Sequence, residues 1–325
     1  MQIEINGEQY ELIDTLECIT LADSFVKNKI GFGHGEAKLY VGNENNRLIS
    51  FLKEINKSKC FFRKSDFREY LHSAKAEFME PQQDYVKKAE MTEIYDCLDF
   101  AINQFPCERL LFDSYRVEVA PPRVYINSKS NYYDFVRSLV LPNISYLSIM
   151  KLRDTEEKIF YYFKVFFNNE SDVCSHIYKE ELEQIALINQ SSKLSDKHKI
   201  SLIEASTGQG EYRKKIVAEC RICPFTNVSD ERLLVATHIK PWALSNEQEK
   251  IDPKNGFLFT PTFEFLFEKG FISFDDDKIL MVSPWLSPAN QENLNIYNGK
   301  YIERLPLDSK RRVYLGFHRE YIFKY

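Results

Sequence analysis

The sequence predicts an α+β protein of two domains. Its 325 residues can build two ordinary cores, and 44% hydrophobic with 28% charged residues is typical of a globular chain. Segments that alternate like strands occur beside segments with helical spacing, and no internal repeat is visible. A polar stretch at 190–199 has few core candidates, so we place a linker at 191–205, between domains at 1–190 and 206–325.

The first 190 residues are predicted to form a mixed α/β domain. They open with a hairpin whose turn is Asn6-Gly7, a dipeptide that favours tight two-residue turns. The later predicted strands are 38–41, 110–128 with a break at Pro121-Pro122, and a pair at 144–153 and 158–168. The predicted helices are 16–29, 46–55, 65–78, 84–105 and 175–189.

The net charge of −5 is unevenly distributed. Residues 207–325 hold 17 basic and 16 acidic side chains, so the acidic excess belongs to the remainder, with 26 basic and 32 acidic. This distribution excludes a polybasic protein but not a local basic face. The clusters Arg213-Lys214-Lys215 and Lys310-Arg311-Arg312 fit either a solvated surface or phosphate binding.

Cysteine usage and hydropathy favour a cytoplasmic chain without membrane spans. Seven cysteines are an odd number, which is typical of a reduced compartment. The most apolar stretch, 159–167, contains Lys164 and is far shorter than the roughly 20 residues that a span needs. The N-terminus has no basic start and no apolar signal core.

The most informative stretch is 231–274, which predicts a strand, a loop, a strand and a helix. An apolar run ends at Thr237-His238, and a polar excursion ends at Asn255-Gly256. A second apolar run, 257–260, precedes Pro261, which suits the first turn of a helix. Gly270 is a suitable residue to end that helix.

This order of elements brings a histidine close to two carboxylates. Glu264 and Glu268 lie one helical turn apart, where they can share a hard cation such as Mg²⁺ or Mn²⁺. A neutral His238 nearby can take a proton from water at pH 7. Taken singly, the glutamates also fit a solvated helix face and the histidine a core position.

At these residues the sequence resembles the HNH nucleases, the ββα-metal family. His238 matches the histidine that ends the first strand, Asn255 matches the loop asparagine, and Glu264 and Glu268 lie at the positions of the helix ligands. The resemblance extends over about residues 206–283, including Gly208-Gln-Gly-Glu-Tyr-Arg213, and is closest to the branch found in bacterial restriction-type endonucleases. It implies a C-terminal ββα-metal (HNH) nuclease domain.

The sequence departs from the family at two places. Thr237 stands where many members have an acidic or histidine metal ligand, and it is a weak ligand. Cys220 and Cys223 match the first pair of a four-cysteine zinc knuckle, but Thr260 and Phe263 occupy the second. Because two thiolates do not complete a tetrahedral site, we expect no structural zinc.

The resemblance implies a role for each residue. His238 would be the general base, Asn255 would brace its loop, and Glu264, Glu268 and, weakly, Thr237 would hold Mg²⁺ or Mn²⁺. Residues expected to contact phosphates of double-stranded DNA are Lys240, Arg213, Lys214 and Lys215. Dimerisation is an expectation from the class, because restriction enzymes often cut both strands as dimers.

Three functional classes remain open. The first is a metal-dependent DNA endonuclease of a bacterial defence system that is specific for a sequence or a modification. In that class the N-terminal domain would read the target. The second is an effector nuclease gated by a ligand or partner, with the acidic N-terminal domain as its sensor. The third is a DNA-binding protein that no longer cleaves.

Overall fold

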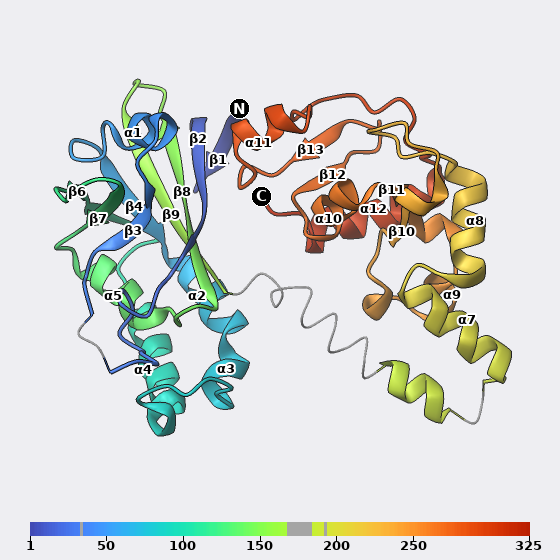
Figure 1. Ribbon diagram of the computed structural model, residues 1–325, viewed down its shortest axis with the longest axis horizontal. Helices are drawn as coiled ribbons and strands as arrows, with labels where there is room; N and C mark the ends of the chain where they lie inside the picture. The colour runs from blue at the N-terminus through green and yellow to red at the C-terminus, as the bar shows by residue number, and fades with distance from the viewer. Residues whose placement is uncertain (33–34, 168–183, 192–193) are drawn as a thin grey trace. The chain divides into compact units, whose positions relative to one another are not determined.

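The computed structural model describes residues 1–325 apart from 33–34, 168–183 and 192–193. The chain divides into two compact units (Figure 1). The N-terminal unit is Met1–Asp172 with Ser287–Ala289, and the C-terminal unit is Val173–Leu286 with Asn290–Tyr325. Both combine helices and strands, which confirms the predicted α+β class. No helix of the described ranges is long and apolar enough to cross a membrane.

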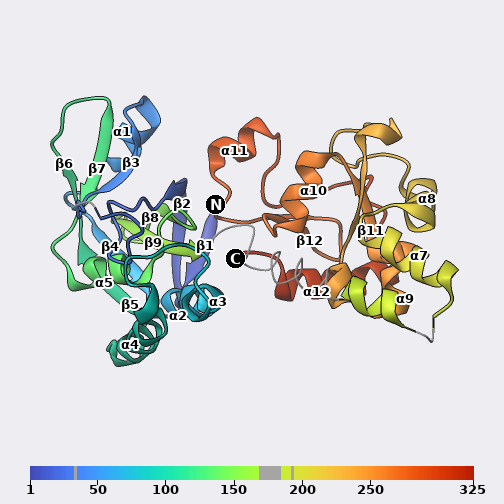
Figure 2. The same cartoon turned by 60° about the horizontal axis from the view of Figure 1, so that its bottom comes forward.

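A six-stranded sheet organises the N-terminal unit, in the order β1-β2-β8-β9-β4-β5. Only β4 and β9 are parallel neighbours in it. A smaller sheet, β3-β7-β6, lies at one end of this unit (Figure 2). The strands are β1 (Gln2–Ile5), β2 (Glu8–Thr20), β3 (Leu39–Asn43), β4 (Lys59–Arg63), β5 (Arg109–Asp113), β6 (Tyr115–Val117), β7 (Arg123–Asn127), β8 (Ser145–Arg153) and β9 (Ile159–Phe167).

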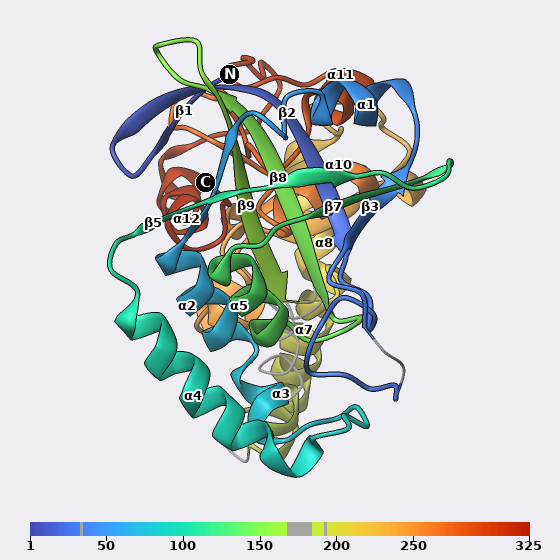
Figure 3. The same ribbon diagram turned by 90° about the vertical axis from the view of Figure 1, so that its left-hand side faces the viewer.

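Some helices of this unit pack against the large sheet, and the others pack against neighbouring helices. The helices are α1 (Asn46–Leu52), α2 (Lys64–Ser73), α3 (Lys75–Met79), the short η1 (Lys88–Glu90), α4 (Met91–Gln104) and α5 (Asn131–Leu139). Helix α2 contacts β4 and β9, and α5 contacts β5; both helices appear near the lower ends of the strands in Figure 3. Phe62, Phe112 and Phe163 meet in the core beneath them, with ring centroids 4.7–5.6 Å apart. The predicted helices at 46–55, 65–78 and 84–105 correspond to α1, to α2 with α3, and to η1 with α4.

Local patterns predicted several strands of this unit. Asn6 and Gly7 have φ of 54° and 79°, the left-handed turn that the first hairpin needs. The pair predicted at 144–153 and 158–168 is β8 and β9, which are antiparallel from Ser145 to Arg153. The 110–128 region forms β5, β6 and β7 with its break before Arg123.

The helix predicted at 16–29 is wrong, because β2 continues to Thr20 and residues 21–29 form turns and irregular backbone without a helix. Leu16 pairs with Ile149 and Ile19 with Leu147, with an irregularity between them. Such a bulge interrupts the strict alternation of a strand and leaves apolar residues three apart, which mimics helical spacing. Pairing with a strand 130 residues away decided the conformation.

The C-terminal unit contains two small antiparallel strand pairs and surrounding helices. The strand pairs are β10 (Val235–His238) with β11 (Gly256–Phe259), and β12 (Ile272–Phe274) with β13 (Leu280–Val282). The helices are α7 (Asp196–Ser206), α8 (Gly210–Cys220), α9 (Glu247–Lys250), α10 (Pro261–Glu268), α11 (Pro288–Asn293), which starts within the N-terminal unit's segment, and α12 (Ser309–Tyr321). Short turns are η2 (Glu231–Leu233), η3 (Trp242–Leu244) and η4 (Pro253–Asn255).

The segment predicted as a linker, 191–205, differs from that expectation. Most of it forms α7, whose Leu202 and Ala205 are fully buried in the C-terminal core. Only these two residues of the helix are buried, so its sequence shows little apolar periodicity. The two units instead meet in sequence at Asp172 and Val173. Of the helix predicted at 175–189, residues 175–183 lie outside the described residues, and 184–190 are helical.

Candidate active site

The stretch singled out in the sequence forms the predicted strand, loop, strand and helix. In the β10–β11 pair, Thr237 is opposite Phe257 and His238 is opposite Gly256. Helix α10 follows with Pro261 in its first turn and packs against both strands (Figure 1). Gly270, with φ of +72°, ends the helix as predicted. The ββα arrangement therefore follows from residues that are close in sequence.

Helix α8 covers the strand pair and holds His238. Its buried face consists of Tyr212, Ile216 and Cys220, at a spacing of four residues. A Cβ at position 256 would lie 2.6 Å from the Tyr212 hydroxyl and would also overlap the Ile216 side chain. Gly256 is thus required for the close approach of α8 and not for its backbone angles, since its φ is an extended −159°.

His238 is half-buried and fixed on two sides. Its ring stacks on Tyr212 with centroids 4.3 Å apart and planes within 6°. Its Nε2 is 2.9 Å from the carbonyl oxygen of Lys250. Because a carbonyl can only accept, Nε2 carries the proton and Nδ1 keeps its lone pair. Burial lowers the pKa of His238 to about 4, so the ring is neutral at pH 7.

Asn255 holds the loop between the two strands. It is fully buried, and its Oδ1 accepts a hydrogen bond of 2.8 Å from the Lys240 backbone nitrogen. Its Nδ2 donates to the carbonyls of Lys240 and Glu249 and to Ser245 Oγ, at 3.0–3.3 Å. The Tyr212 hydroxyl donates to the Asn255 carbonyl at 2.9 Å. One amide therefore fixes both ends of the loop that supplies the acceptor for His238.

Glu264 and Glu268 interact on α10. Burial raises the pKa of Glu264 to about 8, and the hydrogen bond to Glu268 and the charge of Glu268 act in the same direction, while Lys269 partly opposes them. Glu268 is half-exposed and forms a 3.2 Å ion pair with Lys269. Two neighbouring carboxylates whose charges repel are suited to a divalent cation, which would remove the repulsion.

Few other side chains could complete a metal site with Glu264 and Glu268. Thr237, the weak ligand of the prediction, is buried on β10. Within the part of the chain that the structure describes, no three His, Cys, Asp or Glu side chains converge in a way that could hold a metal ion. A cation at Glu264 and Glu268 would therefore need water and substrate oxygens to complete its shell.

The Cys220 and Cys223 pair lies in an environment that does not resemble a zinc knuckle. Burial raises the pKa of Cys220 to about 11, which opposes the thiolate that zinc requires. The Cys223 thiol is 3.7 Å from the Thr260 hydroxyl, where the knuckle would supply a cysteine. Phe225 stacks on Phe263 at 4.1 Å, so an aromatic contact occupies the place of the second cysteine.

The four predicted phosphate contacts differ in availability. Lys240 forms a 2.7 Å ion pair with Glu249 and is mostly buried. Arg213 donates to the Glu231 carbonyl at 2.6 Å, and Lys214 pairs with Glu211 at 2.7 Å on the surface. Lys215 is exposed and forms no ion pair with the residues that the structure describes. Lys214 and Lys215 are the pair best exposed to solvent.

The sequence analysis did not identify two residues that support the candidate site. Tyr212 contacts both His238 and Asn255, and its only signal was its place in the Gly208-to-Arg213 motif. Arg311, which belongs to a basic cluster, is 2% exposed and donates from Nε to the Gly256 carbonyl at 3.1 Å. Its Nη2 pairs with Glu219 at 2.8 Å, which ties α12 to α8 and β11. The sequence of this basic cluster does not indicate which of its three residues is buried.

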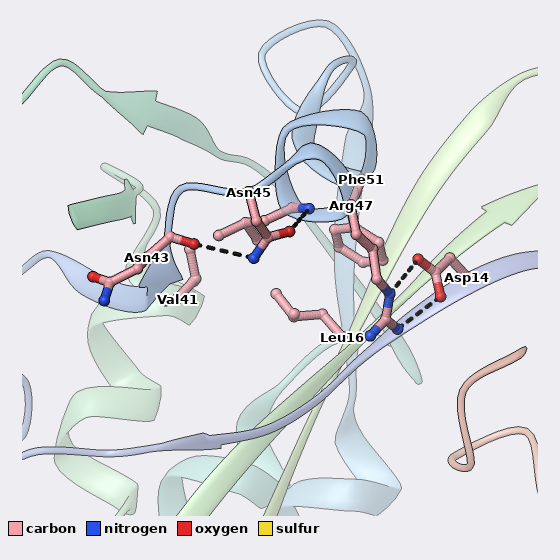
Figure 4. A pocket seen from close by; sticks show the side chains of 9 residues that line it. Asp14, Leu16, Val41, Asn43, Asn45, Arg47 and Phe51 are labelled. Carbon is pink, nitrogen blue, oxygen red and sulfur yellow. Dashed lines mark hydrogen bonds and ion pairs between the residues drawn. The ribbon is translucent and has the colours of Figure 1, made fainter. Parts of the chain in front are cut away.

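The N-terminal unit has a small cavity of about 110 Å³ between β2, β3 and α1 (Figure 4). Arg47 lines it and donates two hydrogen bonds to Asp14, at 2.9 and 3.1 Å, and one to the Thr15 carbonyl. Asn45 accepts from the Leu48 nitrogen and caps α1. These polar groups already have partners within the fold, so we assign no ligand to the cavity.

The comparisons agree with this geometry. Residues 220–275 match the model of a family described as HNH endonuclease. This segment contains β10, β11 and α10, together with His238, Asn255, Glu264 and Glu268. A comparison with curated proteins gave no match. The C-terminal unit of this chain therefore contains an HNH endonuclease domain.

Proposed function

We propose that this protein is a metal-dependent endonuclease that hydrolyses phosphodiester bonds of double-stranded DNA. The observation that carries the proposal is the state of His238. Its Nε2 proton is bound by the Lys250 carbonyl and its ring is neutral at pH 7, so Nδ1 is free to accept a proton. A neutral histidine in this tautomer suits hydrolysis by general base catalysis.

His238 takes a proton from a water molecule, which then attacks the phosphorus in line with the departing 3′ oxygen. Tyr212 keeps the imidazole plane fixed, and Asn255 holds the loop that fixes Nε2. Such positioning reduces the entropy that the reaction must lose on reaching the transition state. The products carry a 5′-phosphate and a 3′-hydroxyl.

Glu264 and Glu268 are the residues that would hold Mg²⁺ or Mn²⁺. The bound cation supplies charge stabilisation at the phosphate and the leaving oxygen. Their fit to a cation rests on their proximity on α10 and on the charge of Glu268, which helps to raise the pKa of Glu264. Lys214 and Lys215 are placed to contact the phosphate backbone, which provides affinity without sequence choice.

We further propose a restriction-type role in bacterial defence, with the N-terminal unit as the region that reads the target and a homodimer as the form that cuts both strands. The acidic excess of residues 1–206 argues against simple clamping of DNA by that unit. A reading unit would need to segregate its charges by face.

A DNA-binding protein that does not cleave is the second candidate. It is favoured by Thr237 at a ligand position and by the presence of only two acidic ligands on α10. Both candidates keep the fold and the contact with DNA, so only turnover separates them.

Plasmid digestion tests the proposal. Supercoiled plasmid, methylated and unmethylated, is incubated with the purified protein and Mg²⁺, Mn²⁺ or a chelator. Discrete bands that need the metal support a specific endonuclease, and a smear, or cleavage only after a trigger is added, supports a gated effector. A gel shift without cleavage of either plasmid in either metal would establish the binding protein instead.

A further inference from the structure

The helix at 184–190 contacts the loop that fixes His238. It is the first described stretch after residues 168–183, and its Ile188 is buried in the core of the C-terminal unit. At its start, Gln184 Nε2 donates to the Ala243 carbonyl at 2.6 Å, and Gln184 Oε1 accepts from Lys250 Nζ. One amide side chain therefore connects η3 and α9, which both belong to the loop between β10 and β11.

Lys250 is an unusual residue for this position, because it is a lysine with only 5% of its surface exposed. Its ammonium lies 4.0 Å from the centroid of the Trp242 ring, which itself donates from Nε1 to the Leu202 carbonyl. A buried ammonium is stabilised by partners around it, and the ring face is one of them. The Gln184 oxygen is an acceptor that the chain supplies from outside the ββα motif.

The backbone of the same lysine holds the catalytic ring. The Lys250 carbonyl is the acceptor for His238 Nε2 at 2.9 Å, so the position of Lys250 fixes which nitrogen carries the proton. Asn255 restrains the loop from within, through the carbonyls of Lys240 and Glu249. Gln184 restrains it from a separate segment of the chain.

We propose that Gln184 is a positioning residue for His238 and acts through Lys250. The inference rests on the proposed function in that His238 is taken as the base. Removal of the Gln184 amide breaks its hydrogen bonds with Lys250 and with the Ala243 carbonyl, so α9 loses this connection to helix 184–190 and shifts. The Lys250 carbonyl then leaves Nε2, and Nδ1 no longer faces the substrate in the required tautomer. A ligand or partner that displaces helix 184–190 would thereby reduce cleavage without touching the ββα motif.

Steady-state cleavage by full-length variants provides the first test. We expect Gln184→Ala to lower kcat for plasmid cleavage about ten- to a hundredfold with little change in KM, because misplacement of a base acts on turnover. Gln184→Glu keeps an acceptor for Lys250 and should retain more of the rate. Leu187→Ala, which truncates an exposed residue on the same helix, serves as the matched control and should behave as wild type.

A double variant shows whether the effect passes through Lys250. In Lys250→Met the buried charge is absent, so adding Gln184→Ala should cost much less than it costs in the wild type. Equal costs in both backgrounds, or a kcat of Gln184→Ala equal to that of Leu187→Ala, would overturn the proposal.

Nitrogen-15 NMR of the histidine side chains provides a readout that does not depend on cleavage. In the wild type we expect His238 to be protonated at Nε2, and in Gln184→Ala to show a mixture with the Nδ1 tautomer. An unchanged Nε2 tautomer in Gln184→Ala would refute the effect of Gln184 on His238, even if no variant cleaves DNA. Conversely, a shifted tautomer in a protein without nuclease activity would support the effect of Gln184 on His238 and reject the proposed function.

Discussion

Two histidines of the C-terminal unit have almost the same surroundings and differ at one ring nitrogen. His238 stacks on Tyr212 and His318 stacks on Phe267, each with ring planes within 6°. Each has Nε2 at 2.9 Å from a backbone carbonyl, and burial lowers the pKa of each to about 4. Both are therefore neutral at pH 7.

The difference lies at Nδ1. In His318 this nitrogen is 3.0 Å from the Ser273 hydroxyl, and the ring is 1% exposed. His238 is only partly buried, and its Nδ1 has no hydrogen-bond partner among the described residues. A low pKa and a fixed ring alone thus describe a packed core histidine equally well. An open lone pair is what makes His238 a candidate base.

Among the other candidate site residues, the carboxylate pair should have the largest effect. In Glu264→Gln/Glu268→Gln both ligand charges are removed, and we expect cleavage to fall about 10²–10³-fold, because charge that develops at the phosphate is no longer stabilised. Isothermal titration should show weaker Mg²⁺ or Mn²⁺ binding than in the wild type. Unaltered affinity for both ions would exclude the pair as ligands.

Loss of the Asn255 side chain, which holds the loop between β10 and β11, should have a smaller effect on the cleavage rate. Asn255→Ala removes four hydrogen bonds and displaces the loop that carries the acceptor for His238, so we expect about a ten- to hundredfold lower rate. Circular dichroism should remain that of a folded protein. Global unfolding of the variant would instead assign Asn255 a purely structural role.

The last prediction concerns stability at low pH, where the buried His318 should contribute a pH dependence. The folded-state pKa of His318, about 4, is below the ~6.5 of an unfolded histidine, so the unfolded chain binds more protons between these values. The stability that this residue contributes is complete above about pH 6.5 and is lost as the pH falls toward 4, by up to ~3 kcal/mol. Urea unfolding at pH 7, 5.5 and 4.5 should show a shallower loss in His318→Gln. Equal pH dependence in both proteins would contradict the assignment.

The sequence predicted those parts of the site that depend on neighbours in the chain. Pro261 and Gly270 mark the ends of α10, and the prediction that Glu264 and Glu268 lie one turn apart on this helix is confirmed. The burial of Arg311 and the stacking of Tyr212 depend on contacts between distant segments, which leave no local pattern. The same applies to α7.

In the N-terminal unit, the sequence predicted local elements but not those that depend on distant pairing. Its hairpin turn and the β8–β9 pair were predictable because the turn residues and alternation are local. The continuation of β2 to Thr20 was not, since a bulge disturbs its alternation and a distant strand stabilises it. Its role as a target-reading unit stays a prediction.

The measurement that tests the central claim most directly is single-turnover plasmid cleavage by His238→Ala beside His318→Gln, with saturating Mg²⁺. The account predicts a rate about 10²–10⁴-fold below wild type for His238→Ala, because a general base contributes this much. His318→Gln, if folded at the assay temperature, should cleave at nearly the wild-type rate. Wild-type cleavage by His238→Ala, or an equal loss in both variants, would contradict the assignment of His238 as the base.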